Sequence, residues 1–303
     1  MKSAVILRSA LHMLAAAALY GVAIAPSPAA EAPDGARIEA LTGLKGKLNA
    51  AEGVFKVSFP RSDIRATVAG VKMNPELGLT AWAAFGGAGD HAMVMGDIVL
   101  LEPEIGPVMD AALGAGLQVT ALHNHFVGES PRVMFMHIGA MGEEEDLARA
   151  VGRVFDALKS AIRDRPALAH ADIDPAASSL DPKKIDAVLG ARGAMKDGVY
   201  KVVIGRRARM AGQEIGKEMG VNTWAAFAGA DERAVVDGDF VMSEEELQAV
   251  LKALRAGRID VVAIHNHMTG ETPHLVFLHY WGIGTSEALA RTLRRALDMQ
   301  LRD

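Results

Sequence analysis

The feature that most constrains this chain is a segment that occurs twice. Residues 121–137 and 263–279 share the order Ala-x-His-Asn-His-x-x-Gly-Glu-x-Pro and end on a third histidine. These two segments hold seven of the ten histidines in the chain, and six of the seven stand at matched positions. From Trp82 and Trp224 to the end of the segments, the two halves align at a constant offset of 142 residues without a gap. Such a chain is expected to fold as two copies of one structural plan.

The similarity begins before the histidine segments and sets the domain boundaries. Residues 37–41 match residues 184–188, and both copies continue with a Val-aromatic-Lys-Val stretch. The intervening stretch is rich in Pro, Ala, Ser and Asp, which is typical of a linker. A chain of 303 residues has room for about two domains of roughly 150 residues. We therefore predict the following organisation: first repeat domain 37–162, linker 163–183, second repeat domain 184–303.

Hydrophobic periodicity predicts the secondary structure of each copy. In the first half it predicts helices at 37–50, 102–113 and 143–162, strands at 54–59, 64–71, 78–85, 92–100, 118–125 and 132–137, and a turn at 127–131. The second half repeats this order, and Ser243 with Glu246 forms a capping box at the start of the helix equivalent to 102–113. The predicted fold class is α+β, with two tandem homologous domains that each carry a mainly antiparallel sheet and helices.

The spacing of the histidines predicts that they gather on one face of a hairpin. Residues two apart on a strand project to the same side, so His123 and His125 project together. A hairpin centred near Ser130 would bring His137 opposite His123. For a hairpin centred near Thr272, the same count gathers the second set: His265, His267 and His279.

Three neutral imidazoles with an open fourth position form the ligand set of a catalytic zinc. Other divalent transition metals (Mn, Fe, Ni or Cu) also accept imidazole ligands. The chain has no cysteine, which excludes thiolate ligands and disulfides. The alternative is that the histidines only pair across strands as structural groups. Their occurrence in both copies favours metal binding.

The turn of each hairpin also carries a carboxylate, Glu129 or Glu271. Each is either a fourth ligand or a general base that moves protons, or else a solvated turn residue. Asp97 and Asp239 could orient an imidazole, but a turn role is favoured for a Gly-Asp pair. The Trp-Ala-Ala-Phe strands are expected in the core.

The first 30 residues have the pattern of a secretory signal peptide. Lys2 and Arg8 precede an apolar run of about 16 residues, and small residues and prolines follow, so cleavage is expected near Ala29 or Ala30. The alternative is an uncleaved anchor, for which the run is short. We expect a soluble periplasmic or secreted protein without stable membrane insertion after cleavage. The net charge of −5 argues against a nucleic-acid partner.

Residues 121–137, with the Trp-Ala-Ala-Phe and Met-Gly-Asp-Ile-Val-Leu strands before them, resemble the LppY/LpqO family of bacterial exported proteins. The resemblance covers nearly all of residues 37–298. The family carries no established activity. Its names suggest lipoproteins, whereas this chain lacks the cysteine that lipid attachment needs, which implies a free exported protein.

A more distant resemblance concerns the histidines alone. A His-x-His followed about a dozen residues later by a third histidine is similar to the zinc site of acetolactate decarboxylase, which also has two similar halves. The resemblance implies a zinc fold of that type, with His123, His125 and His137 as one ligand set and His265, His267 and His279 as the other. Related ester-hydrolase-like proteins share this site.

These observations predict an exported zinc-dependent hydrolase or lyase that acts on a small molecule. A non-catalytic periplasmic module that binds a metal or a ligand is the alternative. In a third reading the histidines only stabilise the hairpins.

Overall fold

The computed structural model describes residues 32–300, and the predicted signal peptide at 1–30 lies outside them. The helices of the described residues are α1 (Gly35–Thr42), α2 (Glu102–Gly114), α3 (Glu144–Asp164), α4 (Pro182–Leu189), α5 (Glu244–Ala256) and α6 (Ser286–Asp298). Within residues 32–300, no helix combines the length and apolar character that crossing a bilayer requires.

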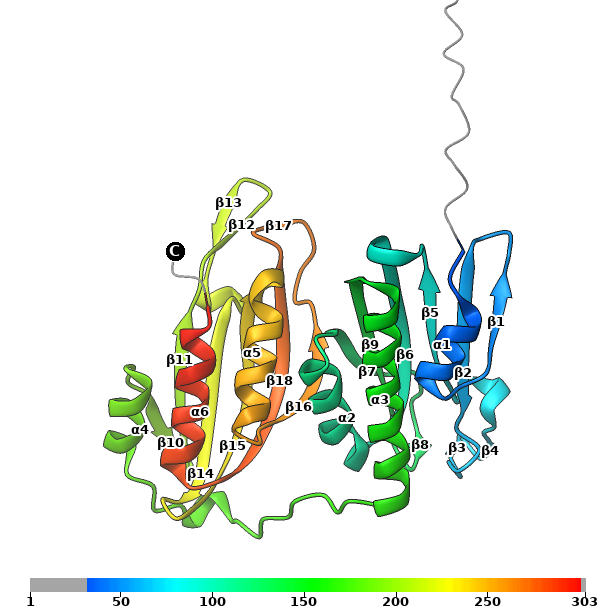
Figure 1. Ribbon diagram of the computed structural model, residues 1–303. Coiled ribbons are helices and arrows are strands. Elements are labelled where there is room, and N and C mark those ends of the chain that lie inside the picture. The colour runs from blue at the N-terminus through cyan, green and yellow to red at the C-terminus, as the bar shows by residue number, and fades with distance from the viewer. Residues whose placement is uncertain (1–31, 301–303) are drawn as a thin grey trace, which may run out of the picture. The chain divides into compact units, whose positions relative to one another are not determined.

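Most strands of residues 32–300 belong to one 12-stranded antiparallel sheet. Its first six strands in spatial order are β1 (Gly46–Asn49), β2 (Val54–Pro60), β5 (Thr80–Gly86), β6 (Ala92–Leu101), β9 (Val133–Gly142) and β7 (Gln118–Asn124). The order continues with β16 (Asp260–His265), β18 (Leu275–Gly284), β15 (Arg233–Ser243), β14 (Asn222–Ala230), β11 (Val199–Gly205) and β10 (Ala194–Lys196). The helices cover one face of this sheet (Figure 1). The α+β class with a mainly antiparallel sheet is therefore confirmed.

Two smaller sheets hold the turns of the histidine hairpins. The first contains β3 (Thr67–Val68), β4 (Val71–Lys72) and β8 (Glu129–Ser130). The second contains β12 (Ala208–Met210), β13 (Gln213–Ile215) and β17 (Glu271–Thr272). Each hairpin turn is thus tied by backbone pairing to a segment from earlier in its own half.

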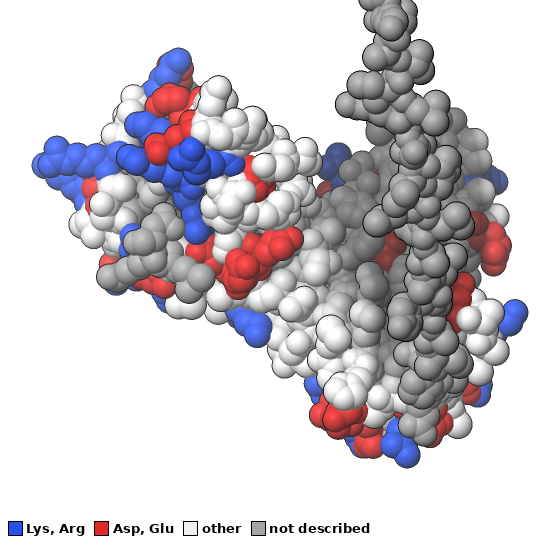
Figure 2. Space-filling view, turned by 90° about the horizontal axis from the view of Figure 1, so that it is seen from above, with Lys and Arg blue, Asp and Glu red and all other residues white. Residues whose placement is uncertain are grey.

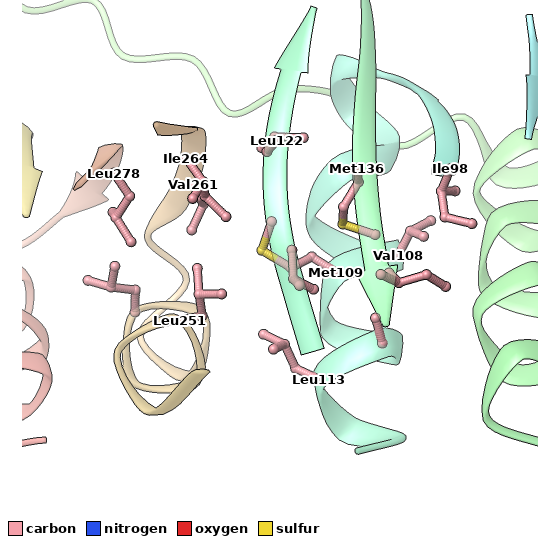
Figure 3. Close-up of a cluster of buried hydrophobic side chains, with 14 of the residues drawn as sticks. Ile98, Val108, Met109, Leu113, Leu122, Met136, Leu251, Val261, Ile264 and Leu278 are labelled. Atoms are coloured by element: carbon pink, nitrogen blue, oxygen red, sulfur yellow. The ribbon is translucent and has the colours of Figure 1, made fainter. Parts of the chain in front are cut away.

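The two halves meet at β7 and β16, where Leu122 pairs with Ile264. These two residues are equivalent under the 142-residue offset, so an approximate twofold axis passes beside them. Their side chains are buried under α2 and α5, in an apolar layer that runs across the junction (Figure 3). Gln248 of α5 both donates to and accepts from the backbone of Val119, at 2.9 Å each. The repeats therefore share one sheet and one core, a union that the sequence analysis did not predict.

Two predicted elements of the first half were wrong, and glycines explain both. The helix predicted at 37–50 ends at Gly43, which adopts φ 65°, and residues 46–49 form β1 instead. The strand predicted at 64–71 is a small hairpin that turns at Ala69 and Gly70, both with positive φ. Left-handed backbone conformations of this kind end regular elements.

In the first half, a buried ion pair anchors the start of α2 to the end of β2. Arg61 is fully buried, and its guanidinium donates to both carboxylate oxygens of Glu104 at 2.8 and 2.9 Å. It also donates to both oxygens of Asp63. Glu104 in turn accepts the backbone N–H of Leu101 at the helix start. The second half repeats the arrangement with Arg206 and Glu246.

In the second half, Asp231 ties the start of α4 to the start of α6. Its carboxylate pairs with the Lys184 ammonium and accepts hydrogen bonds from the Asp181 N–H and the Ser286 hydroxyl. The hydrogen bond from Lys184, with smaller help from these other groups, lowers the pKa of Asp231. A carboxylate with a lowered folded-state pKa stabilises the fold above its unfolded pKa, and this contribution is lost as pH falls through the folded pKa.

We therefore expect Asp231→Asn to lower the melting temperature most near pH 7. Because an unfolded Asp titrates near about pH 3.9, the difference from wild type should shrink below about pH 4 and vanish at more acid pH. Differential scanning calorimetry between pH 2 and pH 8 measures it. A difference that is constant over this range would show that the charge of Asp231 has no such role.

Candidate metal centre

The sheet face opposite the helices carries the same row of side chains in each half. In the first half, Trp82 on β5 pairs with Asp97 on β6, and Asp97 pairs with His137 on β9. Directly opposite residues of antiparallel strands project from the same face. The equivalent row in the second half, on β14, β15 and β18, is Trp224, Asp239 and His279.

This register corrects the prediction that Asp97 and Asp239 lie in turns. Both aspartates lie in the interior of long strands. The glycine before each one does not form a turn but allows a neighbouring group to pack closely. A Cβ on Gly96 would lie 2.8 Å from the carbonyl oxygen of Trp82, and one on Gly238 would lie 2.2 Å from the Tyr280 ring. Both aspartates are therefore held beside the histidines.

The structure gathers the three imidazoles of each copy. The ring centroid of His123 lies 5.1 Å from that of His125 and 5.0 Å from that of His137. The corresponding distances from His265 are 5.1 Å to His267 and 4.8 Å to His279.

The register of the hairpins differs from the prediction by two residues. His137 lies opposite Ala121, and His123 lies opposite Phe135. The first hairpin is thus centred on Glu129, one residue earlier than predicted, and the second is centred on Glu271 in the same way. A shift of the centre by one residue moves each partner by two, which keeps the histidines on the same face.

A phenylalanine fixes the histidine that lies just beyond the end of each strand. The ring of His125 stacks on Phe135 with centroids 3.3 Å apart, and His267 stacks on Phe277 at 3.6 Å. Both phenylalanines project from the histidine face of the hairpin. His125 and His267 lie beyond the backbone hydrogen bonds of β7 and β16, so the phenylalanine rings position their imidazoles.

In the second half, backbone carbonyls orient two of the imidazoles. Nδ1 of His267 lies 3.2 Å from the carbonyl oxygen of Gly220, and Nδ1 of His279 lies 3.3 Å from that of Gly238. A carbonyl oxygen only accepts, so Nδ1 of each ring carries a proton in these contacts, and Nε2 is left as the atom that would bind a metal. This is the arrangement found in metal-ligating histidines.

Asp239 completes a compact ligand set in the second half. Its Oδ2 lies 3.1 Å from Nε2 of His267. Asp239, His265 and His267 each offer a ligand atom, and these atoms lie within 4.8 Å of one another. In the first half the contact between Asp97 Oδ1 and His137 Nε2 is longer, at 3.9 Å. The second set is therefore the better organised of the two.

Buried polar atoms without partners mark both centres. Among the described residues, Oδ1 of Asp97, Oδ1 of Asp239 and Nδ1 of His265 are buried and make no hydrogen bond. Leaving such atoms unsatisfied costs about 1–3 kcal/mol each. A cation bound between the aspartate and the imidazoles would pair with the carboxylate oxygens.

Burial affects the protonation of both the aspartates and the imidazoles. Burial raises the pKa of Asp97 and of Asp239, against the opposing effect of the neighbouring histidines. Burial also lowers the pKa of His125 and of His265, which favours the neutral imidazole. Neutral imidazole is the form that binds metal.

The predicted turn carboxylates lie in the small sheets. Glu129 pairs with Val68 in the backbone ladder of β3 and β8. Glu271 is buried, and its Oε1 accepts the backbone N–H of Leu275 at 2.9 Å, while its Oε2 has no hydrogen-bond partner among the described residues. The carboxylates that share a row with the imidazoles are instead Asp97 and Asp239.

The Trp-Ala-Ala-Phe strands were expected in the core. Trp82 and Trp224 are instead half-exposed beside the histidines. The Lys56 ammonium lies 4.0 Å from the centroid of the Trp82 ring, and Lys201 lies at the same distance from Trp224. Neither lysine was singled out from the sequence as a candidate site residue. Their matched positions in the two Val-aromatic-Lys-Val stretches were the signal that could have found them.

Comparisons with known proteins place the chain in a family. A family model described as Domain of Unknown Function (DUF1259) matches residues 36–157 and again residues 183–299. No curated protein matches the chain. A solved structure, the trimeric bacterial microcompartment shell protein PduB, is 12% identical over 84% of this chain and 90% of its own, with a TM-score of 0.19. That score is too low to indicate a shared fold. Because the two matches cover most of the sequence, the chain belongs to the DUF1259 family and carries two copies of its domain in tandem.

Proposed function

We propose that the protein is an exported, zinc-dependent hydrolase or lyase that acts on a small molecule. The observation that carries the proposal is the buried Oδ1 of Asp239, which has no partner among the described residues and lies beside three gathered imidazoles. The likeness of the histidine spacing to the acetolactate decarboxylase zinc site supports the zinc chemistry. The likeness to the LppY/LpqO family of exported proteins supports export. The signal-like segment at residues 1–30 also supports export.

His265, His267 and His279 would hold the metal in the second half, with Asp239 as a fourth ligand or as the group that orients His267. His123, His125 and His137 would do so with Asp97 in the first half. Zinc supplies Lewis acidity, which polarises a carbonyl group. Glu129 and Glu271 remain the proposed proton carriers, and Asp239 adds a carboxylate in contact with an imidazole.

The alternative is an exported module that binds a metal or ligand without catalysis. Two observations favour it: both halves keep the full set of histidines, and the first centre is open to water, with 41% of the His137 side chain exposed. Catalytic sites usually exclude water more completely.

Metal analysis of the purified protein by mass spectrometry tests the proposal. We expect about two zinc ions per chain, one for each three-histidine set. Because a metal that binds only the folded state stabilises it, EDTA should lower the melting temperature. A panel of esters and keto acids then measures turnover. Protein without stoichiometric metal would overturn the proposal, and bound metal without turnover would favour the alternative.

A further inference from the structure

We propose that the cavity beside the second metal centre binds the anionic group, carboxylate or phosphate, of a small substrate, with Lys201 as its charged contact. Lys56 would serve the first centre in the same way. This inference rests on the proposed function and specifies its substrate class.

The lysines are positioned but not neutralised. Each ammonium lies over a tryptophan ring, which attracts a cation without cancelling its charge. Within residues 32–300, neither Lys56 nor Lys201 forms an ion pair with a carboxylate. Lys201 acts on the carboxylate of Asp237, and Lys56 on that of Asp97, only through space. A cation that is held in place and forms no ion pair is suited to an incoming anion.

The two halves provide an internal comparison of what packing requires. On the buried face of the central strands, equivalent residues differ: Leu122 against Ile264, Met136 against Leu278, and Ile138 against Tyr280. Apolar packing tolerates such exchanges. On the buried face of the strands that carry the lysines and tryptophans, pairs such as Phe85 and Phe227 are identical. Lys56 and Lys201 are exposed, so packing does not explain why both halves have a lysine over a tryptophan. Binding of a ligand at this face does explain it.

A cavity of about 520 Å³ joins the lysine to the metal centre in the second half. The residues lining it include Lys201, Lys217, Asn222, Trp224, Asp239 and His267. Its volume lies within the range of small-molecule sites. The Lys217 ammonium adds positive charge, partly offset by Glu218 at 3.6 Å. An anion in this cavity would contact Lys201 while the rest of the substrate reaches the imidazoles.

The two halves differ in positive charge near this site. Figure 2 shows Lys and Arg side chains, with Asp and Glu side chains among them, gathered at one end of the second half. In the first half, the position of Lys217 is occupied by Pro75. We therefore expect the second site to bind anions more tightly.

Calorimetric titration of the zinc-loaded protein tests the proposal with malonate and inorganic phosphate as probes, and with malonamide as the neutral analogue of malonate. We expect malonate or phosphate to bind, and malonamide to bind at least about tenfold more weakly. Which of the two anions binds tighter assigns the substrate group. The double variant Lys56→Met/Lys201→Met should lose at least about tenfold in anion affinity, the effect of one charge-assisted hydrogen bond. Lys252→Met, an exposed lysine of α5, is the matched control and should bind as wild type does.

The readouts separate this inference from the proposed function. The zinc content of the double variant should equal that of wild type, and Lys201→Arg in the Lys56→Met background should restore most of the affinity. Unchanged anion affinity in zinc-loaded double variant would overturn the inference alone, as would equal binding of malonamide. Wild-type protein that takes up no zinc would overturn the proposed function together with the inference.

Discussion

Replacing Arg61 with Met is expected to lower the free energy of unfolding by about 3–5 kcal/mol, the usual cost of breaking a buried ion pair from one side. The guanidinium is completely buried and makes bidentate hydrogen bonds to Glu104. Only 6% of the Glu104 side chain is exposed, so its charge would remain in the protein interior without a counter-ion. Urea unfolding followed by circular dichroism measures the change.

Two variants test the physical cause. Arg65→Met removes an exposed arginine four residues later and should change stability by no more than about 0.5 kcal/mol. Adding Glu104→Gln to Arg61→Met removes the stranded charge, so the double variant should be more stable than Arg61→Met alone. If the double variant loses as much unfolding free energy as Arg61→Met and Glu104→Gln lose together, the two side chains are not coupled and the explanation is wrong.

Replacing His265 with Ala is expected to weaken zinc binding at the second centre by more than about 100-fold. Loss of a group that only orients a ligand already costs about 10–100-fold in affinity, and His265 belongs to the compact set with Asp239 and His267. Titration against a fluorescent zinc chelator measures the affinity of each site. The number of tight sites per chain should fall by one.

His274→Ala is the matched control for this experiment. His274 lies in the same hairpin but is an exposed residue that pairs with Glu244, and its equivalent in the first half is Arg132. Zinc affinity should therefore be unchanged in His274→Ala. Equal zinc binding by His265→Ala and wild type would exclude the second three-histidine set as a metal centre.

The histidine geometry was predictable because it depends on local rules. Residues two apart on a strand share a face, and the second arm of a hairpin returns along the first. An error of one residue in the hairpin centre left this result intact, since it moved His137 by two positions and not by one. The helices α2, α3, α5 and α6 were equally predictable, because the periodicity of their apolar residues is local.

The role of Asp97 and Asp239 was not predictable in the same way. Gly-Asp is a common turn pair, and nothing local distinguishes that use from a glycine that admits a neighbouring backbone. The distinction rests on Trp82 and Tyr280, whose atoms occupy the space a side chain would need. The lysine–tryptophan pairs likewise form between strands whose register the sequence does not reveal.

The duplicated histidine segment, read from the sequence alone, thus determined the tandem plan and the imidazoles that share a face, and periodicity gave most helices and strands in their order along the chain. These follow from periodicity and repetition, which act over a few residues. The tertiary structure decided that Asp97 and Asp239 join the imidazoles, that a lysine lies over each tryptophan, and that Leu122 and Ile264 join the halves into one sheet. Each of these depends on which strands lie side by side, and packing of the whole chain sets that arrangement.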